Sequence, residues 1–111
     1  MVKYVPDRGD IVWLEFDPQA GCEIQKRRPA VVISPKKYNS KTSLAVFMPV
    51  TSQVKGYPFE CTFKLKEIQG AILSDQIRSL DWKARRAKLI TKIPGDVLEE
   101  AVEKFSLLLR G

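Results

Sequence analysis

The hydrophobic residues of this 111-residue chain fall into short runs separated by proline, glycine and polar residues. In residues 9–17, Ile11, Trp13 and Phe16 alternate with polar positions such as Asp10. Further short apolar runs occupy residues 29–34, 44–50, 59–65, 70–73, 76–80 and 87–93. Runs of this length, rich in β-branched and aromatic residues, predict strands. The nearly continuous apolar run at 29–34 predicts a central strand that is buried on both faces.

Only two segments favour a helix. Residues 36–42 are expected to form one irregular helical turn. Near the end of the chain, Asp96 is predicted to cap a helix that runs to about Leu109, with Glu99 completing a capping-box pair. Its apolar residues recur at helical spacing and predict one stripe packed on the sheet: Val97, Leu98, Ala101, Val102, Phe105, Leu108 and Leu109. Five to seven strands with one terminal helix predict a small, strongly curved antiparallel β-barrel in a single domain, residues 1–111.

The segment between the first two predicted strands, residues 18–27, has little periodicity and contains Pro18 and Gly21. We expect an exposed loop. It is long for a hairpin connection, and long loops on small domains often carry function.

The chain is basic, with 19 Lys and Arg against 13 Asp and Glu, a net charge of +6. The cations cluster at residues 26–28, 36–37 and 83–88. This charge favours a polyanionic partner such as nucleic acid. An acidic protein partner, or a merely solubilising surface, would account for the same pattern.

The apolar runs reach only about five residues, whereas a bilayer span needs ~20. The first eight residues carry no apolar h-region, so we expect a cytoplasmic protein without a membrane segment. Cys22 and Cys61 are far apart and there is no histidine, so we expect two free thiols and no zinc site or other cofactor. Any phosphodiester chemistry must use Arg, Thr, Glu, Asp or Lys instead of histidine.

Four motifs occur in order along the chain: GDIV (9–12), RPAVVIS (28–34), PVTS (49–52) followed by KGYPFE (55–60), and DQIRS (75–79). Together they resemble the MazF/PemK family of toxin endoribonucleases. The resemblance implies an SH3-like barrel with a C-terminal helix and a homodimer that an acidic antitoxin neutralises. It also implies metal-independent, sequence-specific cleavage of single-stranded mRNA, which leaves 2′,3′-cyclic phosphate and 5′-OH ends.

Arg28 is the first catalytic candidate. The following proline restrains it to an extended backbone, and its guanidinium presents a planar fork of donors suited to phosphate oxygens. It would neutralise the charge of a pentacoordinate phosphorane, although a surface arginine before a proline has the same sequence. The resemblance implies that Thr51 anchors the scissile phosphate beside Arg28, while Thr51 alone could be a loop threonine at a strand end. Glu23 is the candidate for proton transfer, and a solvated loop carboxylate is its alternative.

The resemblance also implies that Gln76, Arg78 and Ser79 lie at the RNA groove and the dimer interface, although Arg78 could instead pair with Asp81. Three further cations complete the predicted RNA-binding set. Lys26 and Arg27 belong to the loop 18–27, and Lys55 belongs to the KGYPFE segment. The first loop departs from the family pattern Gly-x-Glu-Gln-x-Gly-x-Arg-Pro: its glutamine is one place later and a lysine replaces the second glycine. Base preference therefore cannot be carried over from the family.

Two other classes of function fit the same fold. A gyrase poison of this type relies on a Trp-Gly-Ile C-terminus, whereas this chain ends Leu-Leu-Arg-Gly. A non-catalytic SH3-like module that binds nucleic acid or peptide would explain the fold and the charge. Such a module makes no demand for Arg28 and Thr51 at adjacent strand ends.

Overall fold

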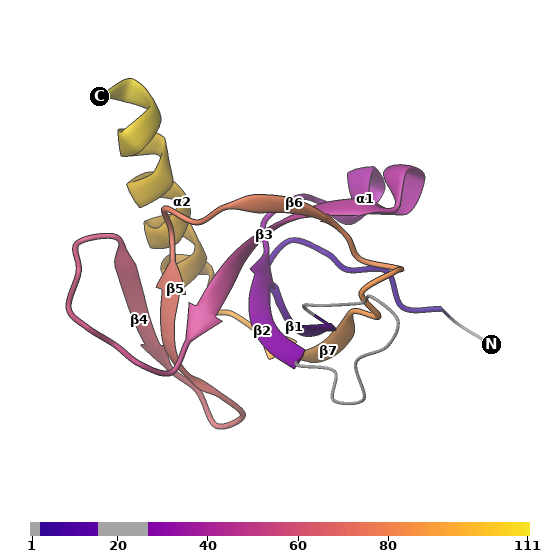
Figure 1. Ribbon diagram of the computed structural model, residues 1–111, viewed down its shortest axis with the longest axis horizontal. Helices are drawn as coiled ribbons and strands as arrows, with labels where there is room; N and C mark the ends of the chain where they lie inside the picture. Colours follow the sequence, from indigo (N-terminus) through magenta and orange to yellow (C-terminus); the bar gives the residue numbers. More distant parts are fainter. Residues whose placement is uncertain (1–2, 16–26) are drawn as a thin grey trace, which may run out of the picture.

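The computed structural model describes residues 3–15 and 27–111, which form seven strands and two helices (Figure 1). In chain order these are β1 (Asp10–Glu15), β2 (Arg27–Val32), α1 (Lys36–Thr42), β3 (Leu44–Thr51), β4 (Glu60–Lys64), β5 (Gln69–Leu73), β6 (Arg78–Asp81), β7 (Lys88–Lys92) and α2 (Gly95–Arg110). Each predicted run therefore overlaps a strand, although β2 begins at Arg27, the last residue of the segment that was expected to be a loop. The helix α1 is longer than the single irregular turn that was expected.

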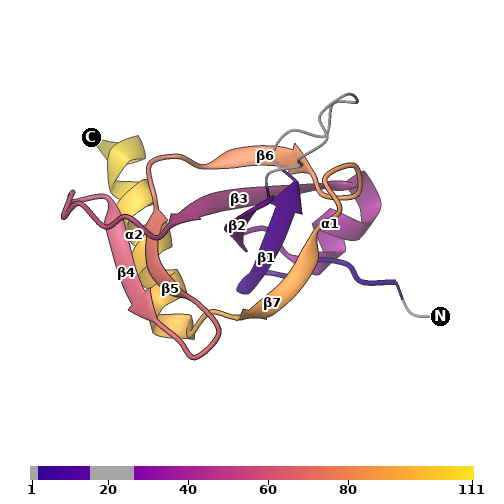
Figure 2. The ribbon, with the colours of Figure 1, turned by 60° about the horizontal axis from the view of Figure 1, so that its bottom comes forward.

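The strands form one antiparallel sheet in the order β4-β5-β3-β2-β1-β7, and β6 pairs with β3. The long strand β3 joins the two parts of the sheet, because it pairs with β2 and β6 along most of its length and with β5 at its last residues. Figures 1 and 2 show that the sheet curls around itself, with α2 against β4 and β5 at one end and α1 at the other. The predicted curved antiparallel barrel with a C-terminal helix is confirmed.

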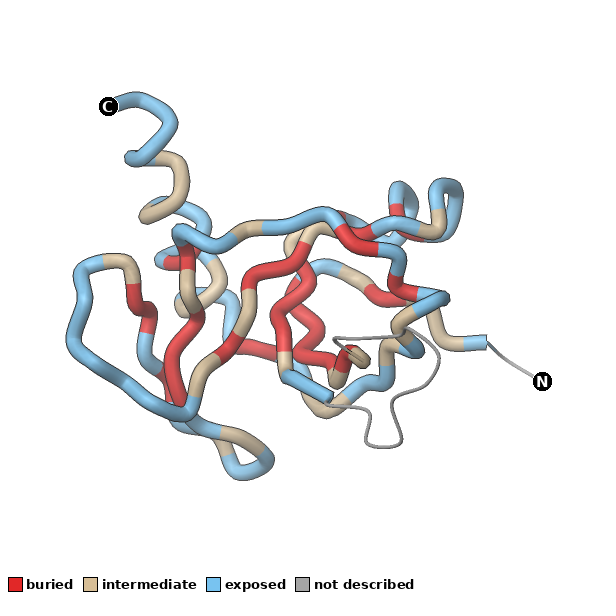
Figure 3. The backbone as a smooth tube through the Cα atoms, in the orientation of Figure 1, coloured by how far each residue is buried: buried red, intermediate tan, exposed pale blue. Residues whose placement is uncertain are grey.

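The buried residues concentrate in the central strands (Figure 3) and form two apolar clusters. Successive residues of β2 enter different clusters: Val31 packs with Met48 and Ile72, whereas Val32 packs with Phe47. Side chains alternate across a strand, so a strand that contributes to both clusters must be apolar at consecutive positions. This confirms the prediction of a buried central strand.

The start of α2 corrects the predicted cap. The N-cap residue is Pro94 and no side chain caps the helix, so Asp96 lies inside the first turn. The carbonyl of Pro94 accepts the first bonds, from the N–H groups of Val97 and Leu98 at 3.1 Å each. Asp96 remains favourable there, because a carboxylate near a helix N-terminus interacts well with the helix dipole.

In the predicted apolar stripe of α2, Val97, Leu98, Ala101 and Phe105 pack on the sheet, whereas Val102 is 38% exposed. Ala101 is fully buried, and Phe105 is partly buried against the cluster around Ile72. Leu108 and Leu109 are 47% and 71% exposed, because the helix extends past the sheet (Figure 1). Within the described residues, no helix is both long and apolar enough to cross a membrane.

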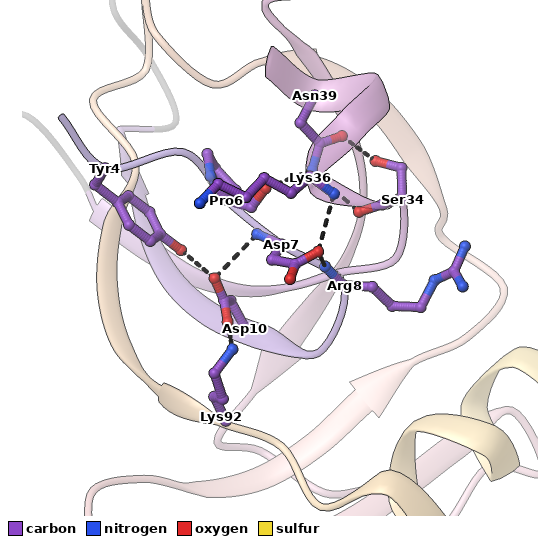
Figure 4. A network of polar contacts seen from close by, with 9 residues as sticks. All are labelled: Tyr4, Pro6, Asp7, Arg8, Asp10, Ser34, Lys36, Asn39 and Lys92. Atoms are coloured by element: carbon purple, nitrogen blue, oxygen red, sulfur yellow. Dashed lines mark hydrogen bonds and ion pairs between the residues drawn. The ribbon is translucent and has the colours of Figure 1, made fainter. Parts of the chain in front are cut away.

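A buried carboxylate fastens the N-terminal segment to the barrel (Figure 4). Asp10 is 2% exposed and accepts hydrogen bonds from the Tyr4 hydroxyl at 2.6 Å and the backbone N–H of Asp7 at 3.0 Å. Its other oxygen lies 2.6 Å from Nζ of Lys92. Asp10 belongs to the GDIV motif, which therefore has a structural role in this fold.

Candidate active site

The ends of β2 and β3 bring the two main candidates together. Ala30 of β2 is paired with Pro49 of β3 in antiparallel register. Arg28 lies two residues before Ala30, and Thr51 lies two residues after Pro49. In an antiparallel pair these two steps run toward the same end of the pair, so Arg28 and Thr51 lie at the same end of β2 and β3.

Both side chains line an open groove of about 700 Å³. Its walls come from β1, from the paired ends of β2 and β3, from β5 and from the start of β6: Trp13, Arg28, Pro29, Pro49, Val50, Thr51, Ser52, Gln53, Ile68, Gln69, Leu73, Gln76 and Arg78. Four of the predicted site residues, Arg28, Thr51, Gln76 and Arg78, thus share one surface. The groove combines two guanidinium groups, hydroxyls and amides with apolar patches, which suits a strand of nucleotides.

Thr51 is held by backbone contacts on two sides. Its Oγ1 accepts a hydrogen bond from the N–H of Gln53 at 3.1 Å, which turns the chain sharply after β3. On the other side, Thr51 is paired with Ala71 of β5, and Gly70 lies directly against the Thr51 carbonyl. A hydroxyl that accepts this bond can still donate its own proton, as binding a phosphate oxygen requires.

Arg28 lies at the exposed start of β2, next to Arg27. In the β1–β2 pairing, Arg28 is opposite Leu14 and Arg27 is opposite Glu15. The guanidinium of Arg27 lies 5.2 Å from the centre of the Trp13 ring, and Trp13 lines the groove. Arg27 therefore borders the groove through Trp13 without lining it.

The DQIRS segment enters the groove from β6. The N–H of Gln76 donates to the carbonyl of Leu73 at 3.1 Å, which closes the turn after β5. Arg78 is opposite Phe47 on β3, and Ser79 is opposite Val46. Ser79 is exposed and does not line the groove, whereas Gln76 and Arg78 of the same motif do.

Asp81, the alternative partner considered for Arg78, has a different role. Its Oδ1 accepts hydrogen bonds from the N–H groups of Lys83 at 3.0 Å and Ala84 at 2.9 Å. These bonds shape the turn between β6 and β7.

Lys55 lies in the exposed loop between β3 and β4, where a buried carboxylate holds the backbone. Glu60 is 7% exposed. Its Oε1 accepts hydrogen bonds from the N–H groups of Lys55 at 3.1 Å and Gly56 at 2.8 Å. The backbone carbonyl of Glu60 accepts from Nζ of Lys104 on α2 at 2.7 Å. Sequence reasoning missed this role of Glu60; the signal was a carboxylate four residues after the glycine of the KGYPFE segment.

Glu23 and Lys26 lie outside the described residues, as do Phe16 and Cys22. Among the described residues, no group of three or more His, Cys, Asp or Glu side chains could hold a metal ion.

The curled sheet, the C-terminal helix and the groove at the strand ends define a small SH3-like barrel with a polar, arginine-containing cleft. Comparison with known proteins identifies the family. Residues 7–109 match the model of the PemK-like, MazF-like toxins of type II toxin–antitoxin systems. The chain belongs to this family, and the family prediction made from the motifs is confirmed.

The relatives include characterised toxins of Escherichia coli. The chain is 42% identical over 107 residues to the endoribonuclease toxin MazF of strain K12, covering 96% of both chains. It is 32% identical to the endoribonuclease PemK of Escherichia coli, covering 93% of this chain and 81% of PemK. The predicted enzyme class, an endoribonuclease, is thus confirmed at the level of the family.

Solved structures agree with the fold. The crystal structure of MazF from Deinococcus radiodurans matches with a TM-score of 0.87 and 50% identity, covering 98% of this chain and 100% of that one. A MazE–MazF crystal structure from the same organism matches with a TM-score of 0.88 and 50% identity, covering 96% and 98%. The Mycobacterium tuberculosis toxin MazF-mt6 shares only 13% identity with this chain at a TM-score of 0.71, which indicates the fold alone.

Proposed function

We propose that this protein is the toxin of a toxin–antitoxin pair and cleaves single-stranded mRNA at specific sequences without a metal ion. The observation that carries the proposal is the shared groove of Arg28, Thr51, Gln76 and Arg78. The groove is lined by side chains of several strands, so an unpaired strand that lies in it would have its bases exposed to the walls. Sequence-specific readers of RNA use such unpaired strands.

In the proposed reaction, the 2′-oxygen of a ribose attacks the phosphorus of its own 3′-phosphate. The bond from phosphorus to the 5′-oxygen of the next nucleotide breaks. The 2′-hydroxyl loses a proton and the leaving 5′-oxygen gains one, which gives a 2′,3′-cyclic phosphate and a 5′-OH end. Arg28 neutralises the charge that builds on the phosphorane oxygens, and Thr51 donates a hydrogen bond that holds the phosphate in line.

Proton transfer needs a second group, because an arginine with a pKa above ~12 stays protonated near neutral pH and cannot accept the proton. We propose Glu23 for this role. Gln76 and Arg78 would contact the bases and phosphates next to the scissile bond. Lys26, Arg27, Lys55 and Ser79 would extend the RNA-binding surface beyond the groove.

The family relationship supports two further assignments. A MazE–MazF structure of Deinococcus radiodurans matches nearly the whole chain, so we propose that a MazE-like antitoxin with an acidic segment binds this protein. We further propose that the chain acts in the cytoplasm as a homodimer, folded as one domain over residues 1–111. The +6 charge suits both an acidic protein segment and RNA.

The test is incubation of the purified protein with a long single-stranded RNA in excess EDTA, followed by mapping of the cut ends. We expect discrete cuts that carry 2′,3′-cyclic phosphate. Arg28→Ala should lower the rate by about 10²–10³-fold, as the loss of one charge-stabilising donor does elsewhere. Arg28→Lys should retain part of the rate, because it keeps the charge but loses the planar fork. Arg110→Ala, the same change at the exposed end of α2, is the control and should cleave normally.

Circular dichroism and size-exclusion chromatography show whether each variant remains folded. A folded Arg28→Ala protein with normal cleavage would refute the role of Arg28. Intact RNA with wild-type protein that still binds it would refute the enzyme and favour a non-catalytic module.

A further inference from the structure

A second hollow lies at the far end of β6 from the catalytic groove. It measures about 390 Å³ and is called here the Trp82 pocket. It brings together the N-terminal segment, α1 and the turn between β6 and β7, with Lys3, Tyr4, Ser40, Trp82, Lys83 and Arg86 among its lining residues. The turn contains the basic cluster at 83–88, which the catalytic groove does not use.

The Trp82 pocket has the chemistry of a site for phosphate groups. Three cations line it and none of its described lining residues is acidic. Lys3 and Lys83 are exposed, and the Arg86 side chain remains 80% exposed even though it lies 3.9 Å from the Glu15 carboxylate. Guanidinium and ammonium groups that converge on a hollow from separate segments form a natural site for an anion with several oxygens.

The floor of the pocket is rigid and aromatic. Trp82 is 6% exposed, and its Nε1 donates a hydrogen bond to the carbonyl of Asn39 at 2.9 Å. Nζ of Lys83 lies 5.6 Å from the centre of the Trp82 ring, so the indole supports the ammonium group at the rim. Tyr4 is likewise held by its bond to Asp10. Preorganised donors lose less entropy when they bind a ligand.

The charges of the two helices differ in sign. Around the pocket, α1 adds the exposed cations Lys36, Lys37 and Lys41. At the opposite end (Figures 1 and 2), α2 carries four acidic residues against the two cations Lys104 and Arg110. A polyanion in the groove therefore meets a more favourable field toward the Trp82 pocket than along α2.

We propose that the Trp82 pocket binds backbone phosphates of the RNA strand outside the catalytic groove, on the side toward which β6 runs. The inference rests on the proposed function. β6 links the two sites directly, since Arg78 lines the groove and Asp81 precedes Trp82. Trp82 is four residue steps from Arg78, and four steps along an extended chain cover about 13 Å, so an RNA only a few nucleotides longer than the groove reaches the pocket.

The test compares two RNAs that contain the same mapped cleavage site. One is a short oligonucleotide that fills only the groove, and the other has single-stranded extensions on both sides. Lys3→Gln/Lys83→Gln removes two pocket cations that lie outside the groove. The matched control, Lys64→Gln/Lys66→Gln, removes the same charge from exposed residues of β4 and the turn that follows it. KM and kcat are measured for both RNAs over a range of NaCl concentrations.

With wild-type protein, the extended RNA should have the lower KM. In the pocket variant this advantage should fall on the order of tenfold, and the log–log dependence of KM on salt should flatten by about 1.4, as expected for two lost phosphate contacts at ~0.7 each. The kcat of both RNAs and the KM of the short RNA should stay unchanged, and the control should keep the full advantage.

Three results would overturn the proposal. The first is an equal loss of the advantage in the pocket variant and the control, which would reflect overall charge. The second is an unchanged advantage in the pocket variant; weakened binding of polyglutamate by that variant would then assign the pocket to an acidic protein segment. The third is wild-type protein that cleaves neither RNA, which refutes the proposed function itself. Cleavage of the short RNA by the wild-type protein thus distinguishes a failure of the pocket proposal from a failure of the proposed function.

Discussion

A Cβ atom on Gly70 would lie 2.2 Å from the carbonyl oxygen of Thr51 and 3.1 Å from its carbonyl carbon. No side chain can be accommodated at that distance without moving the backbone of one strand. Gly70 therefore permits β5 to approach the end of β3, and this approach fixes the position of Thr51 at the groove. The glycine contributes no functional group, yet it determines where Thr51, the proposed phosphate anchor, lies.

Gly70→Ala should consequently damage activity more than a surface glycine substitution does. We expect a loss of about 1–3 kcal/mol in the free energy of unfolding from overpacking. A shift of the Thr51 backbone by even 1 Å can cost about 10²-fold in rate. Gly95→Ala is the matched control, because nothing lies within 4 Å of its Cβ position and it begins a helix. Urea unfolding and RNA cleavage rates provide the comparison, and equal rates for the two variants would contradict this role of Gly70.

Thr51 itself can be tested by separating its hydroxyl from its shape. Thr51→Val keeps the branched side chain but loses the donor for phosphate and the acceptor for the Gln53 N–H. Thr51→Ser keeps both. We expect cleavage by the valine variant to fall about 10²-fold or more, and the serine variant to remain within a few-fold of wild type. If the two variants cleave RNA at the same rate, the hydroxyl is not the phosphate anchor.

Glu60 should control the loop that carries Lys55. Glu60→Ala leaves the N–H groups of Lys55 and Gly56 without their buried acceptor, which costs about 1–3 kcal/mol of unfolding free energy. Because the loop is then displaced from the groove edge, KM should rise more than kcat falls. Glu60→Gln retains a carbonyl oxygen and should restore part of the wild-type KM. A change in kcat alone, with KM unaltered, would contradict a role in positioning the loop.

The sequence predicted the elements of this fold because their signals are local. Strands such as β2 and helix α2 are recognisable from the periodicity of their own apolar residues. Register is not local: nothing within residues 28–34 or 49–52 indicates that Ala30 pairs with Pro49. The family motifs suggested that Arg28 and Thr51 act together, and the structure shows that both side chains line one groove.

The residues that sequence reasoning missed act through long-range backbone contacts. Glu60 appeared as one letter of a motif, and Gly70 as the first residue of a strand. Their roles depend on neighbours that only folding brings close, namely the amides of the preceding loop and the carbonyl of Thr51. The cap of α2 was misplaced for a similar reason, since Pro94 can supply the first carbonyl of the helix without any side-chain bond.

Cys61 should be unreactive in the folded protein. It is a fully buried free thiol, and desolvation, followed by the neighbouring Glu100 carboxylate, raises its pKa to about 11. Only the thiolate reacts with alkylating agents, so native Cys61 should be labelled by iodoacetamide at pH 8 far more slowly than in urea. The measurement uses a Cys22→Ser variant, so that only Cys61 is available to react. Rapid labelling of the native protein would contradict the burial of this thiol.

The network around Asp10 should make the protein sensitive to alkali. Burial, followed by the hydrogen bond to Asp10, raises the pKa of Tyr4, and the hydrogen bond to the same carboxylate raises the pKa of Lys92. A group whose pKa is higher in the folded state contributes stability that is complete below its unfolded pKa and declines above it. For tyrosine and lysine this decline begins near pH ~10, so the free energy of unfolding should fall as the pH rises from 10.

Tyr4→Phe isolates the tyrosine contribution. The variant should be less stable at pH 8, because it loses a hydrogen bond to a charged group, worth about 1.5–3 kcal/mol. It should also lose less stability than wild type between pH 10 and 11, since no hydroxyl remains to ionise on unfolding. Tyr57→Phe, a change at a side chain that is 58% exposed, should leave the alkaline slope as in wild type. Urea unfolding at each pH measures both quantities, and parallel slopes for wild type and Tyr4→Phe would show that the Tyr4–Asp10 bond does not govern alkaline stability.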